Sequence, residues 1–390
     1  MAKVKVFNVG QGDSILLEPE EGCDFCGEVF LIDVGPGNLD ITKQIDKNKK
    51  IHLILTHSHT DHINGLKFFW KDSFSQIEEI IVPFCQNEIM LIAKAILNLR
   101  GMNMAVDCNE FIHDLEEMIN GQIFLKQISR QIGGPSITYA YEGQDYCAHL
   151  ECLNPPVDME INNWIDEMEE EDISQVLENL FEENFAEHLK RYMSSSNKYA
   201  YLESPYFMDI TLRGKEDRIL QEYEYNRTNF VLDFIMSNYK IMQEFNENPT
   251  RGRLRKVHCQ FQGKVHDTCI VLRAEYENTF LFTGDASKRV FKRLMKKGKD
   301  IKATYLKVSH HGSVQNIDLH ILRAINPKTA IISHGNRSFG RAKDFHPNIK
   351  VLQMLQKENV KILLTNDVIK NNVVVMKKAN HCQDAFVEIM

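Results

Sequence analysis

Residues 51–62 read IHLILTHSHTDH, and this stretch is the most informative part of the chain. Its first half is a short apolar run of the kind that forms a buried strand. The six positions that follow the threonine hold His57, His59, Asp61 and His62. Imidazole nitrogens and carboxylate oxygens are ligands that zinc and manganese accept. A loop at the end of a strand can turn alternate side chains toward one point, so the pattern predicts one cation on the first two histidines and a second on Asp61 and His62.

Strand-like and helical segments alternate on both sides of this loop. Helical periodicity is present at 63–69, 88–100 and 109–118. The predicted strands are 4–9, 14–17, 28–34, 51–56, 147–153, 269–274, 279–283, 304–309, 330–333, 361–365 and 373–376. Strands in two sets, with helices between several of them, indicate a layered α/β architecture.

The composition changes after Pro156. Residues 160–193 are rich in Glu, Leu, Phe and Met at helical spacing, and 169–172 form an acidic run. We therefore expect the first half of the α/β domain at 1–156, a mainly helical insertion at 157–257 and the second half at 258–390. The acidic insertion would repel a nucleic-acid backbone, so we expect it to cap a cleft or to bind a protein partner.

The overall charge places a limit on the class of partner. The 390 residues carry 46 Lys+Arg against 54 Asp+Glu, a net charge of −8, so no global positive field attracts nucleic acid or an anionic membrane. Local basic runs at 251–256 and 292–299 could still contact phosphates, although the second is spaced like a solvated helix face.

The cellular setting is predicted from hydropathy and cysteine usage. No apolar run approaches eighteen residues, and the N-terminus has no signal-peptide pattern. Nine irregularly spaced cysteines indicate reduced thiols in a bacterial cytoplasm. The pair Cys23 and Cys26 stands alone, so a hairpin with two thiols is favoured over a structural zinc.

Several motifs together resemble a known family. HSHTDH matches the HxHxDH signature of the metallo-β-lactamase superfamily, and the other motifs follow in the expected order. They are FNVGQGDSILLE at 7–18, LFTGDA at 281–286, LKVSHHGS at 306–313 and AIISHGN at 330–336. More narrowly, they resemble the metallo-β-lactamase domain of competence DNA-uptake channel proteins. The resemblance covers roughly 3–155 and 258–376 and implies a four-layer αββα sandwich.

The resemblance also implies how further residues act. Asp285 corresponds to the aspartate that bridges two divalent cations, Zn²⁺ or Mn²⁺, which lie roughly 3.5–4 Å apart and activate water. Asp33 is expected to accept a hydrogen bond from a ligand histidine, and Asp13 to support the metal loop.

The third histidine ligand of the first cation is the point at which the chain departs from the family. That ligand usually precedes the bridging aspartate on a strand. His266 is the nearest candidate, about one residue out of register, while His149 and His258 are weaker options. The DNA-uptake relatives often have asparagine in this region.

The motif SHHGS contains two consecutive histidines, and either of them could be the metal ligand. Adjacent side chains of an extended chain point to opposite sides, so only one of His310 and His311 is expected to bind metal. Alignment with shorter SGH motifs favours His311. The other histidine, or His346 in the segment DFHP, would then protonate a leaving group or contact the substrate.

These features predict a metal-dependent hydrolase, and most specifically a phosphodiesterase or nuclease acting on DNA or RNA. One alternative is hydrolysis of a small phosphodiester, a cyclic nucleotide or a lactone, which the negative net charge favours. The other is a non-catalytic protein that binds a partner through the insertion.

Overall fold

The structure is a computed structural model of the 390-residue chain. It describes residues 2–19, 27–69, 74–101, 109–130, 134–147, 149–156, 230–231, 233–235, 237–245, 247–339, 344–370, 373–378 and 386–389. The chain divides into two compact units. The first consists of Met1–Phe84, Ile123–Pro155 and His266–Met390, and the second of Cys85–Gln122 and Pro156–Val265.

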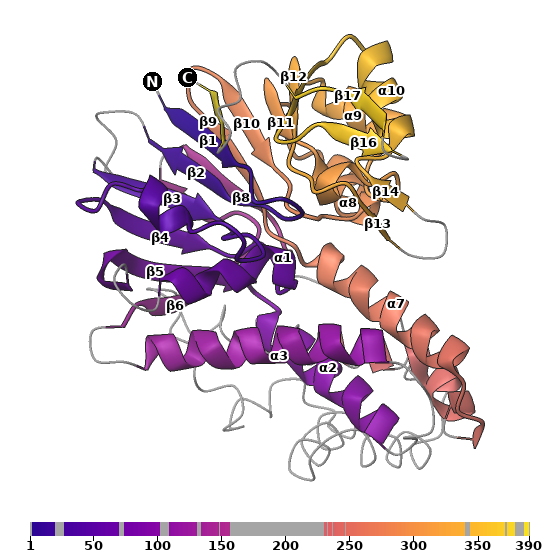
Figure 1. The fold of residues 1–390 in the computed structure, drawn as a ribbon. Helices are drawn as coiled ribbons and strands as arrows, with labels where there is room; N and C mark the ends of the chain where they lie inside the picture. Colours follow the sequence, from indigo (N-terminus) through magenta and orange to yellow (C-terminus); the bar gives the residue numbers. More distant parts are fainter. Residues whose placement is uncertain are drawn as a thin grey trace. The chain divides into compact units, whose positions relative to one another are not determined.

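The first unit contains a seven-stranded sheet made mainly from the start of the chain (Figure 1). Its order is β18-β1-β2-β3-β4-β5-β6, and β3, β4, β5 and β6 run parallel. The strands are β1 (Lys3–Phe7), β2 (Ile15–Glu18), β3 (Glu28–Ile32), β4 (Lys50–Ile54), β5 (Ile77–Pro83), β6 (Ser136–Ala140) and β18 (Phe386–Ile389).

A second seven-stranded sheet of this unit is built mostly from later residues. Its order is β15-β12-β11-β10-β9-β8-β7, with β10, β11, β12 and β15 parallel. The strands are β7 (Asp145–Cys147), β8 (Leu150–Asn154), β9 (Val271–Glu275), β10 (Thr279–Phe282), β11 (Tyr305–Lys307), β12 (Thr329–Ile332) and β15 (Lys361–Leu364).

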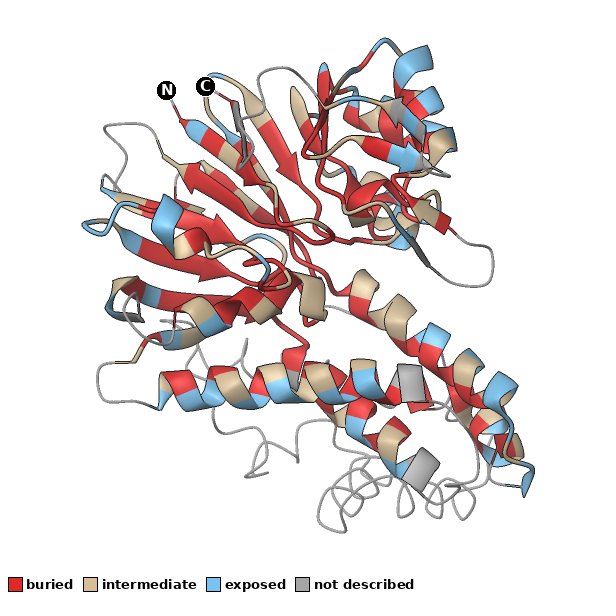
Figure 2. Ribbon diagram, viewed as in Figure 1, coloured by how far each residue is buried: buried red, intermediate tan, exposed pale blue. Residues whose placement is uncertain are grey.

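The two sheets pack face to face around one apolar layer. Phe30 and Ile54 from the first sheet share a buried cluster with Leu272 and Phe282 from the second. Figure 2 shows the strands of both sheets as mostly buried. Strands with alternating inward side chains give a sandwich of this kind.

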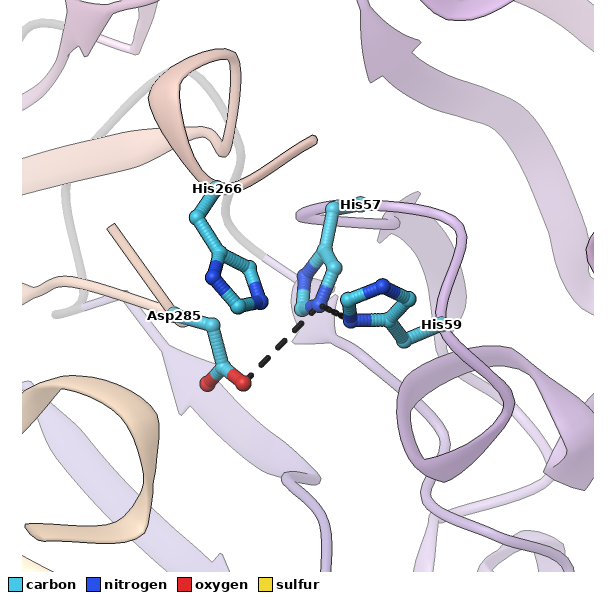
Figure 3. Close-up of side chains that lie close together, drawn as sticks. All are labelled: His57, His59, His266 and Asp285. Atoms are coloured by element: carbon cyan, nitrogen blue, oxygen red, sulfur yellow. Dashed lines mark hydrogen bonds and ion pairs between the residues drawn. The ribbon is translucent and has the colours of Figure 1, made fainter. Parts of the chain in front are cut away.

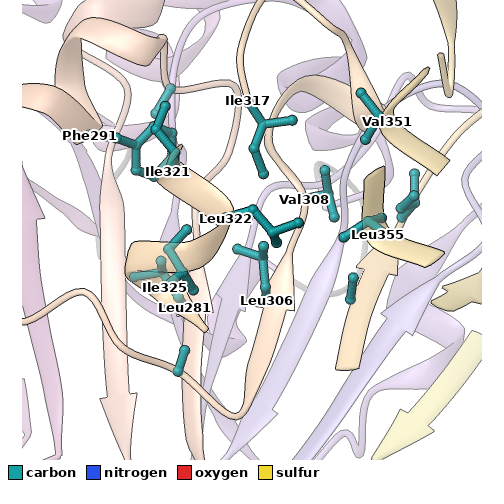
Figure 4. Packing of buried hydrophobic residues seen from close by; sticks show 14 of the residues in the cluster. Leu281, Phe291, Leu306, Val308, Ile317, Ile321, Leu322, Ile325, Val351 and Leu355 are labelled. Atoms are coloured by element: carbon teal, nitrogen blue, oxygen red, sulfur yellow. The ribbon is translucent and has the colours of Figure 1, made fainter. Parts of the chain in front are cut away.

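Helices cover the outer face of the second sheet. They are α8 (Lys288–Lys296), α9 (Leu319–Ile325) and α10 (Ile349–Lys357). Figure 4 shows side chains of these helices, such as Phe291, Ile321 and Leu355, packed with Leu306 and Val308 from the region of β11. Each helix begins at a polar cap whose side chain accepts a backbone N–H, namely Ser287, Asp318 and Asn348.

The first sheet is also covered on both faces, because Leu31, Leu53 and Ile80, which alternate with the inward side chains, are buried. The α/β sandwich predicted from the sequence is therefore confirmed. The remaining elements of this unit are short. They are η1 (Ile41–Gln44), α1 (Thr60–Ile63), η2 (Asn64–Phe68), η3 (Phe74–Gln76), η5 (Ser309–Gly312), β13 (Arg337–Phe339), β14 (Asp344–His346), β16 (Val368–Lys370) and β17 (Val373–Met376).

The second unit is helical where it is described. It contains α2 (Gln86–Gly101), most of α3 (Asn109–Ser129) and α7 (Arg251–Asp267) as far as Val265. Its buried α7 positions include Leu254, Val257, Phe261 and Val265, which are three or four residues apart along one face. Residues 157–229, which include most of the expected insertion, lie outside the described residues, so the boundaries 157–257 stay a prediction. No helix in the described part of the chain has the length and apolar character needed to cross a membrane.

Candidate metal centre

The candidate site lies where parallel strands of both sheets end. The HSHTDH segment follows β4, Asp33 follows β3, Asp285 follows β10, and His310 and His311 follow β11. The carboxyl ends of parallel strands meet at one edge of a sheet, which is where open α/β folds bind ligands. The packing of the two sheets brings both edges together, so side chains 250 residues apart in the chain become neighbours.

One group of potential ligands consists of His57, His59, His266 and Asp285 (Figure 3). Their ligand atoms all lie within 4.8 Å of one another. The Nε2 atom of His57 is 2.9 Å from Nδ1 of His59 and 3.9 Å from Oδ2 of Asp285. Three imidazoles and one carboxylate match the donors expected of zinc or manganese.

A second group, Asp61, His62 and His311, adjoins the first. The Nε2 atom of His311 is 3.3 Å from Oδ2 of Asp61, and Nε2 of His62 is 3.9 Å from Oδ1 of the same carboxylate. Asp285 lies between the two groups, because Nε2 of His62 is 3.5 Å from its Oδ1 and Nε2 of His311 is 3.6 Å from its Oδ2. This arrangement is what a carboxylate shared by two cations requires.

Buried polar atoms without partners show that these residues fit such cations. Within the two ligand groups, five buried ligand-type atoms of the described residues have no hydrogen-bond partner. They are Nε2 of His59, His62, His266 and His311, and Oδ1 of Asp285. A buried polar atom left unpaired costs about 1–3 kcal/mol, and native proteins contain few of them. Several such atoms in one place indicate a ligand, and the donor set suits a divalent metal.

The surrounding hydrogen bonds fix which ring nitrogens face the centre. Oδ2 of Asp33 accepts from Nδ1 of His62 at 2.7 Å and from the Thr56 hydroxyl at 2.7 Å. That hydroxyl oxygen in turn accepts from Nδ1 of His57 at 3.1 Å. When these rings are neutral, the proton lies on Nδ1 and the lone pair of Nε2 points to the centre. Asp33 thus accepts from His62, and its expected role in supporting a metal ligand stays a prediction.

His311 is oriented in the same way by a backbone carbonyl. Its Nδ1 lies 3.1 Å from the carbonyl oxygen of Ser333, which can only accept. Nδ1 therefore carries the proton and Nε2 faces Asp61.

Asp13 is paired with a buried lysine. The Lys307 ammonium group contacts the Asp13 carboxylate, donates to the Gly284 carbonyl oxygen at 3.0 Å, and lies 3.9 Å from Oδ1 of Asp285. Oδ1 of Asp13 is also 3.6 Å from Nδ1 of His311. Asp13 therefore lies next to the second ligand group, and its charge is paired with that of Lys307.

The ionisation of the site follows from burial and neighbouring charge. Burial alone would raise the pKa of Asp285, but His310, His311 and His62 hold that pKa well below its ordinary value. For His62, burial is outweighed by Asp285, Asp33 and Asp61, which raise its pKa well above the usual value. Burial and the neighbouring histidines His62 and His59 lower the pKa of His57 well below its ordinary value, so this ring stays neutral.

The backbone of the SHHGS segment differs from the extended chain assumed from the sequence. His310 has φ 49° and His311 has φ 53°, so both adopt the left-handed conformation. The rule that adjacent side chains of an extended chain point to opposite sides therefore does not apply to these two histidines. Nε2 of His310 also lies 3.5 Å from Oδ2 of Asp285. His311, however, is the member that falls in a ligand group. Two successive left-handed residues cost energy, and such strain concentrates at functional sites.

Close backbone approaches explain two glycines of the motifs. A Cβ atom on Gly12 would lie 2.1 Å from the Asp61 carbonyl oxygen, and one on Gly284 would lie 2.5 Å from Sγ of Cys269. Both glycines have positive φ. They let the GQGDS turn pack against the backbone of Asp61 and the LFTGDA turn pack against the side chains of Cys269 and Thr56.

The three candidates for the third histidine of the first group have different surroundings. His266 is the one that lies with His57 and His59, but it occupies the end of helix α7, not a strand. His149 lies against Tyr276, with ring centroids 5.2 Å apart. His258 belongs to the second unit, where its Nε2 is 3.1 Å from Oδ2 of Asp114.

His346 is buried beside His310, and their ring centroids are 4.8 Å apart. Oε1 of Gln11 accepts from the Gly335 N–H, so its Nε2 faces Nδ1 of His346 at 3.5 Å as the donor. Nε2 of His346 lies 3.6 Å from Oδ2 of Asp344. The protein thus contacts both ring nitrogens, and the expected role of His346 as an acid stays a prediction.

Sequence reasoning did not single out Lys307, Cys269 or Asn316. Sγ of Cys269 accepts from the Asp285 N–H at 3.2 Å and lies 3.8 Å from Nδ1 of His57, and burial raises the pKa of this thiol to about 12. The only signal for Lys307 was its place inside the LKVSHHGS motif. Cys23 and Cys26 lie outside the described residues.

Comparison with known proteins agrees with this geometry. Residues 8–74 match the family model of the metallo-beta-lactamase superfamily. The chain is also 38% identical over 88 residues to the ComE operon protein 3 of Bacillus subtilis (strain 168), a match that spans 23% of this chain and 11% of that relative. The resemblance stated from the motifs is thus confirmed, and it indicates a metal-dependent hydrolase.

Proposed function

We propose that the chain is a metal-dependent phosphodiesterase whose substrate is DNA or RNA. The observation that carries the proposal is the pair of adjoining ligand groups, His57/His59/His266 and Asp61/His62/His311, with Asp285 between them. The similarity of the motifs to the metallo-β-lactamase domain of DNA-uptake proteins supports a nucleic-acid substrate.

Different residues of the site have different roles in the proposed reaction. When bound, two divalent cations would lower the pKa of a water molecule and stabilise charge on phosphoryl oxygens. Asp33 and the Ser333 carbonyl hold the ligand imidazoles in the tautomer that presents Nε2. Lys307 balances part of the charge of the buried carboxylates Asp13 and Asp285. A fixed arrangement of this kind avoids reorganisation during the reaction.

The direct test is cleavage of labelled single- and double-stranded DNA and RNA with Mn²⁺ or Zn²⁺ present. Cleavage by the wild type and its absence in Asp285→Asn would support the proposal, since the variant separates intrinsic activity from contamination. If all four substrates stay intact while metal analysis shows both cations bound, the nuclease proposal is wrong.

A small phosphodiester, a cyclic nucleotide or a lactone is the second candidate substrate, and the charge distribution favours it. The net charge is −8, and part of the basic run on α8 is paired internally, since Arg293 contacts Glu142 and Nζ of Lys297 lies 3.7 Å from the same carboxylate. Nucleic-acid binding relies on unpaired basic groups. Turnover of bis(p-nitrophenyl) phosphate, cyclic nucleotides or lactones without nucleic-acid cleavage would establish this candidate instead.

A non-catalytic role in partner binding would be indicated if no substrate were turned over and partner binding survived Asp61→Ala. The acidic part of the insertion, around the run 169–172, is the expected partner surface, and it lies outside the described residues.

A further inference from the structure

Asn316 follows the SHHGS motif and is buried beside the candidate metal centre. Its Nδ2 atom donates to the carbonyl oxygen of Asp285 at 2.9 Å and to that of Ala286 at 3.1 Å. Its Oδ1 atom lies 3.0 Å from Nδ1 of His310. The side chain thus connects the backbone around Asp285 to the first histidine of the motif.

These contacts determine the orientation of the Asn316 amide. Backbone carbonyl oxygens only accept hydrogen bonds, so the end of the amide that faces two of them must be the NH₂ group. The oxygen end is then the one that faces His310. An amide oxygen also only accepts, so Nδ1 of His310 carries a proton.

A proton on Nδ1 determines the state of the other ring nitrogen of His310, Nε2. A neutral imidazole protonated at Nδ1 has a lone pair at Nε2. That atom is 3.5 Å from Oδ2 of Asp285, and the His310 side chain keeps 22% of its surface exposed. Among the described residues, His310 is in neither ligand group, so its lone pair faces the centre from beside the ligand atoms.

We propose that Asn316 is a positioning residue that fixes His310 as the Nδ1-protonated tautomer, so that His310 acts first as a proton acceptor through Nε2. This inference rests on the proposed hydrolytic function and deepens it. It changes the expectation that His310 is a ready acid for the leaving group. His310 can donate a proton from Nε2 only after that nitrogen has taken one up.

The proton balance of the step is simple. An O–H bond of water breaks, its proton goes to Nε2 of His310, and the oxygen forms a bond to phosphorus. The bond from phosphorus to the leaving oxygen breaks with its electron pair on that oxygen. The proton on Nε2 then passes to the leaving oxygen, directly or through solvent, and the neutral ring is restored.

The first test measures the tautomer without any substrate. Long-range ¹H–¹⁵N correlation spectra of the protein with ¹⁵N-labelled histidine distinguish protonated from unprotonated ring nitrogens, and the His310→Ala variant assigns the signals. We expect a protonated Nδ1 and an unprotonated Nε2 on His310 at neutral pH, with and without Zn²⁺. A protonated Nε2 on neutral His310 in the wild type would overturn the inference, whatever the substrate of the protein.

The second test is a double-mutant cycle on turnover of bis(p-nitrophenyl) phosphate. We expect His310→Ala to lower kcat by about 100-fold and Asn316→Leu by about 10-fold, with KM nearly unchanged. If Asn316 acts through His310, Asn316→Leu added to His310→Ala causes no further loss. Fully additive losses would show a general structural role and overturn the inference. Equal metal content in all variants is the control, and the tautomer test on the wild type does not depend on the folding of Asn316→Leu.

Discussion

Two buried histidines, one on β4 and one in the segment that follows it, have similar partners but different surroundings. His52 on β4 is held between two glutamates, with Nδ1 2.9 Å from Oε1 of Glu79 and Nε2 2.5 Å from Oε2 of Glu28. His62, after the same strand, has Nδ1 on Asp33 but no hydrogen-bond partner for Nε2 among the described residues. Both rings are almost fully buried.

The difference separates a structural cluster from a candidate site. At His52 both ring nitrogens are satisfied, and Oε2 of Glu79 also accepts from Thr138 at 3.1 Å. At His62, Nε2 faces carboxylates without a hydrogen-bond partner, an arrangement that is stable only with a proton or a cation between them. Burial and nearby carboxylates alone do not mark a metal site, whereas the unsatisfied ligand atoms do.

Asp285→Asn should have the largest effect of the changes predicted here, and it alters the cluster that contains His62. The neutral amide of asparagine cannot balance the positive charge of two cations. We therefore expect kcat to fall by about a thousandfold, which corresponds to an activation barrier higher by about 4 kcal/mol. Steady-state kinetics together with elemental analysis measures this, and far-UV circular dichroism checks the fold. Near-normal kcat would contradict the two-cation centre.

His52→Gln should affect stability and leave metal binding unchanged. Breaking a buried ion pair is expected to lower the free energy of unfolding by about 3 kcal/mol. Urea denaturation of the wild type and the variant gives this value. The increase in Tm on adding Zn²⁺ should persist in His52→Gln and disappear in Asp285→Asn. Loss of the Zn²⁺ effect in His52→Gln would remove the distinction between the two clusters.

Asp33→Asn should weaken metal binding without removing any ligand. The amide accepts less strongly from Nδ1 of His62 and from Thr56, so the ligand rings are oriented less well. We expect metal affinity to fall by about 10–100-fold. Competition with a chromophoric chelator measures the affinity. An unchanged dissociation constant would show that Asp33 does not orient the ligands.

The pH dependence of stability should show the smallest effect. Burial lowers the pKa of His52, but hydrogen bonds and charge from Glu79 and Glu28 outweigh it and raise the pKa above 6.5. A raised pKa in the folded state means that the stabilisation is complete below about pH 6.5 and is lost as pH rises through the folded-state pKa. The stability difference between wild type and His52→Gln should therefore shrink from pH 6 to pH 9 in urea titrations. A constant or growing difference would show that His52 is not held in its charged form.

Much of the fold was predictable because buried strands leave short apolar runs. The strands around 4–9, 28–34, 51–56 and 279–283 were expected and are present. β5 and β6 were missed, although IEEIIVP and SITYA contain β-branched residues, because charged or polar residues interrupt both runs. His266 lies on helix α7, which continues to Asp267, whereas the corresponding ligand of the family usually lies on a strand.

The sequence alone determined the family resemblance, the α/β class and the residues that can ligate metal, because these depend on residue type and local spacing. Only the tertiary structure decided which atoms face one another. The left-handed conformation at His310 and His311, the Asn316 amide that bridges to Asp285, and the Lys307 ammonium group beside Asp13 are seen only in the folded chain. Hydrogen-bond direction and charge balance depend on distances between groups that are remote along the chain, and no local pattern encodes them.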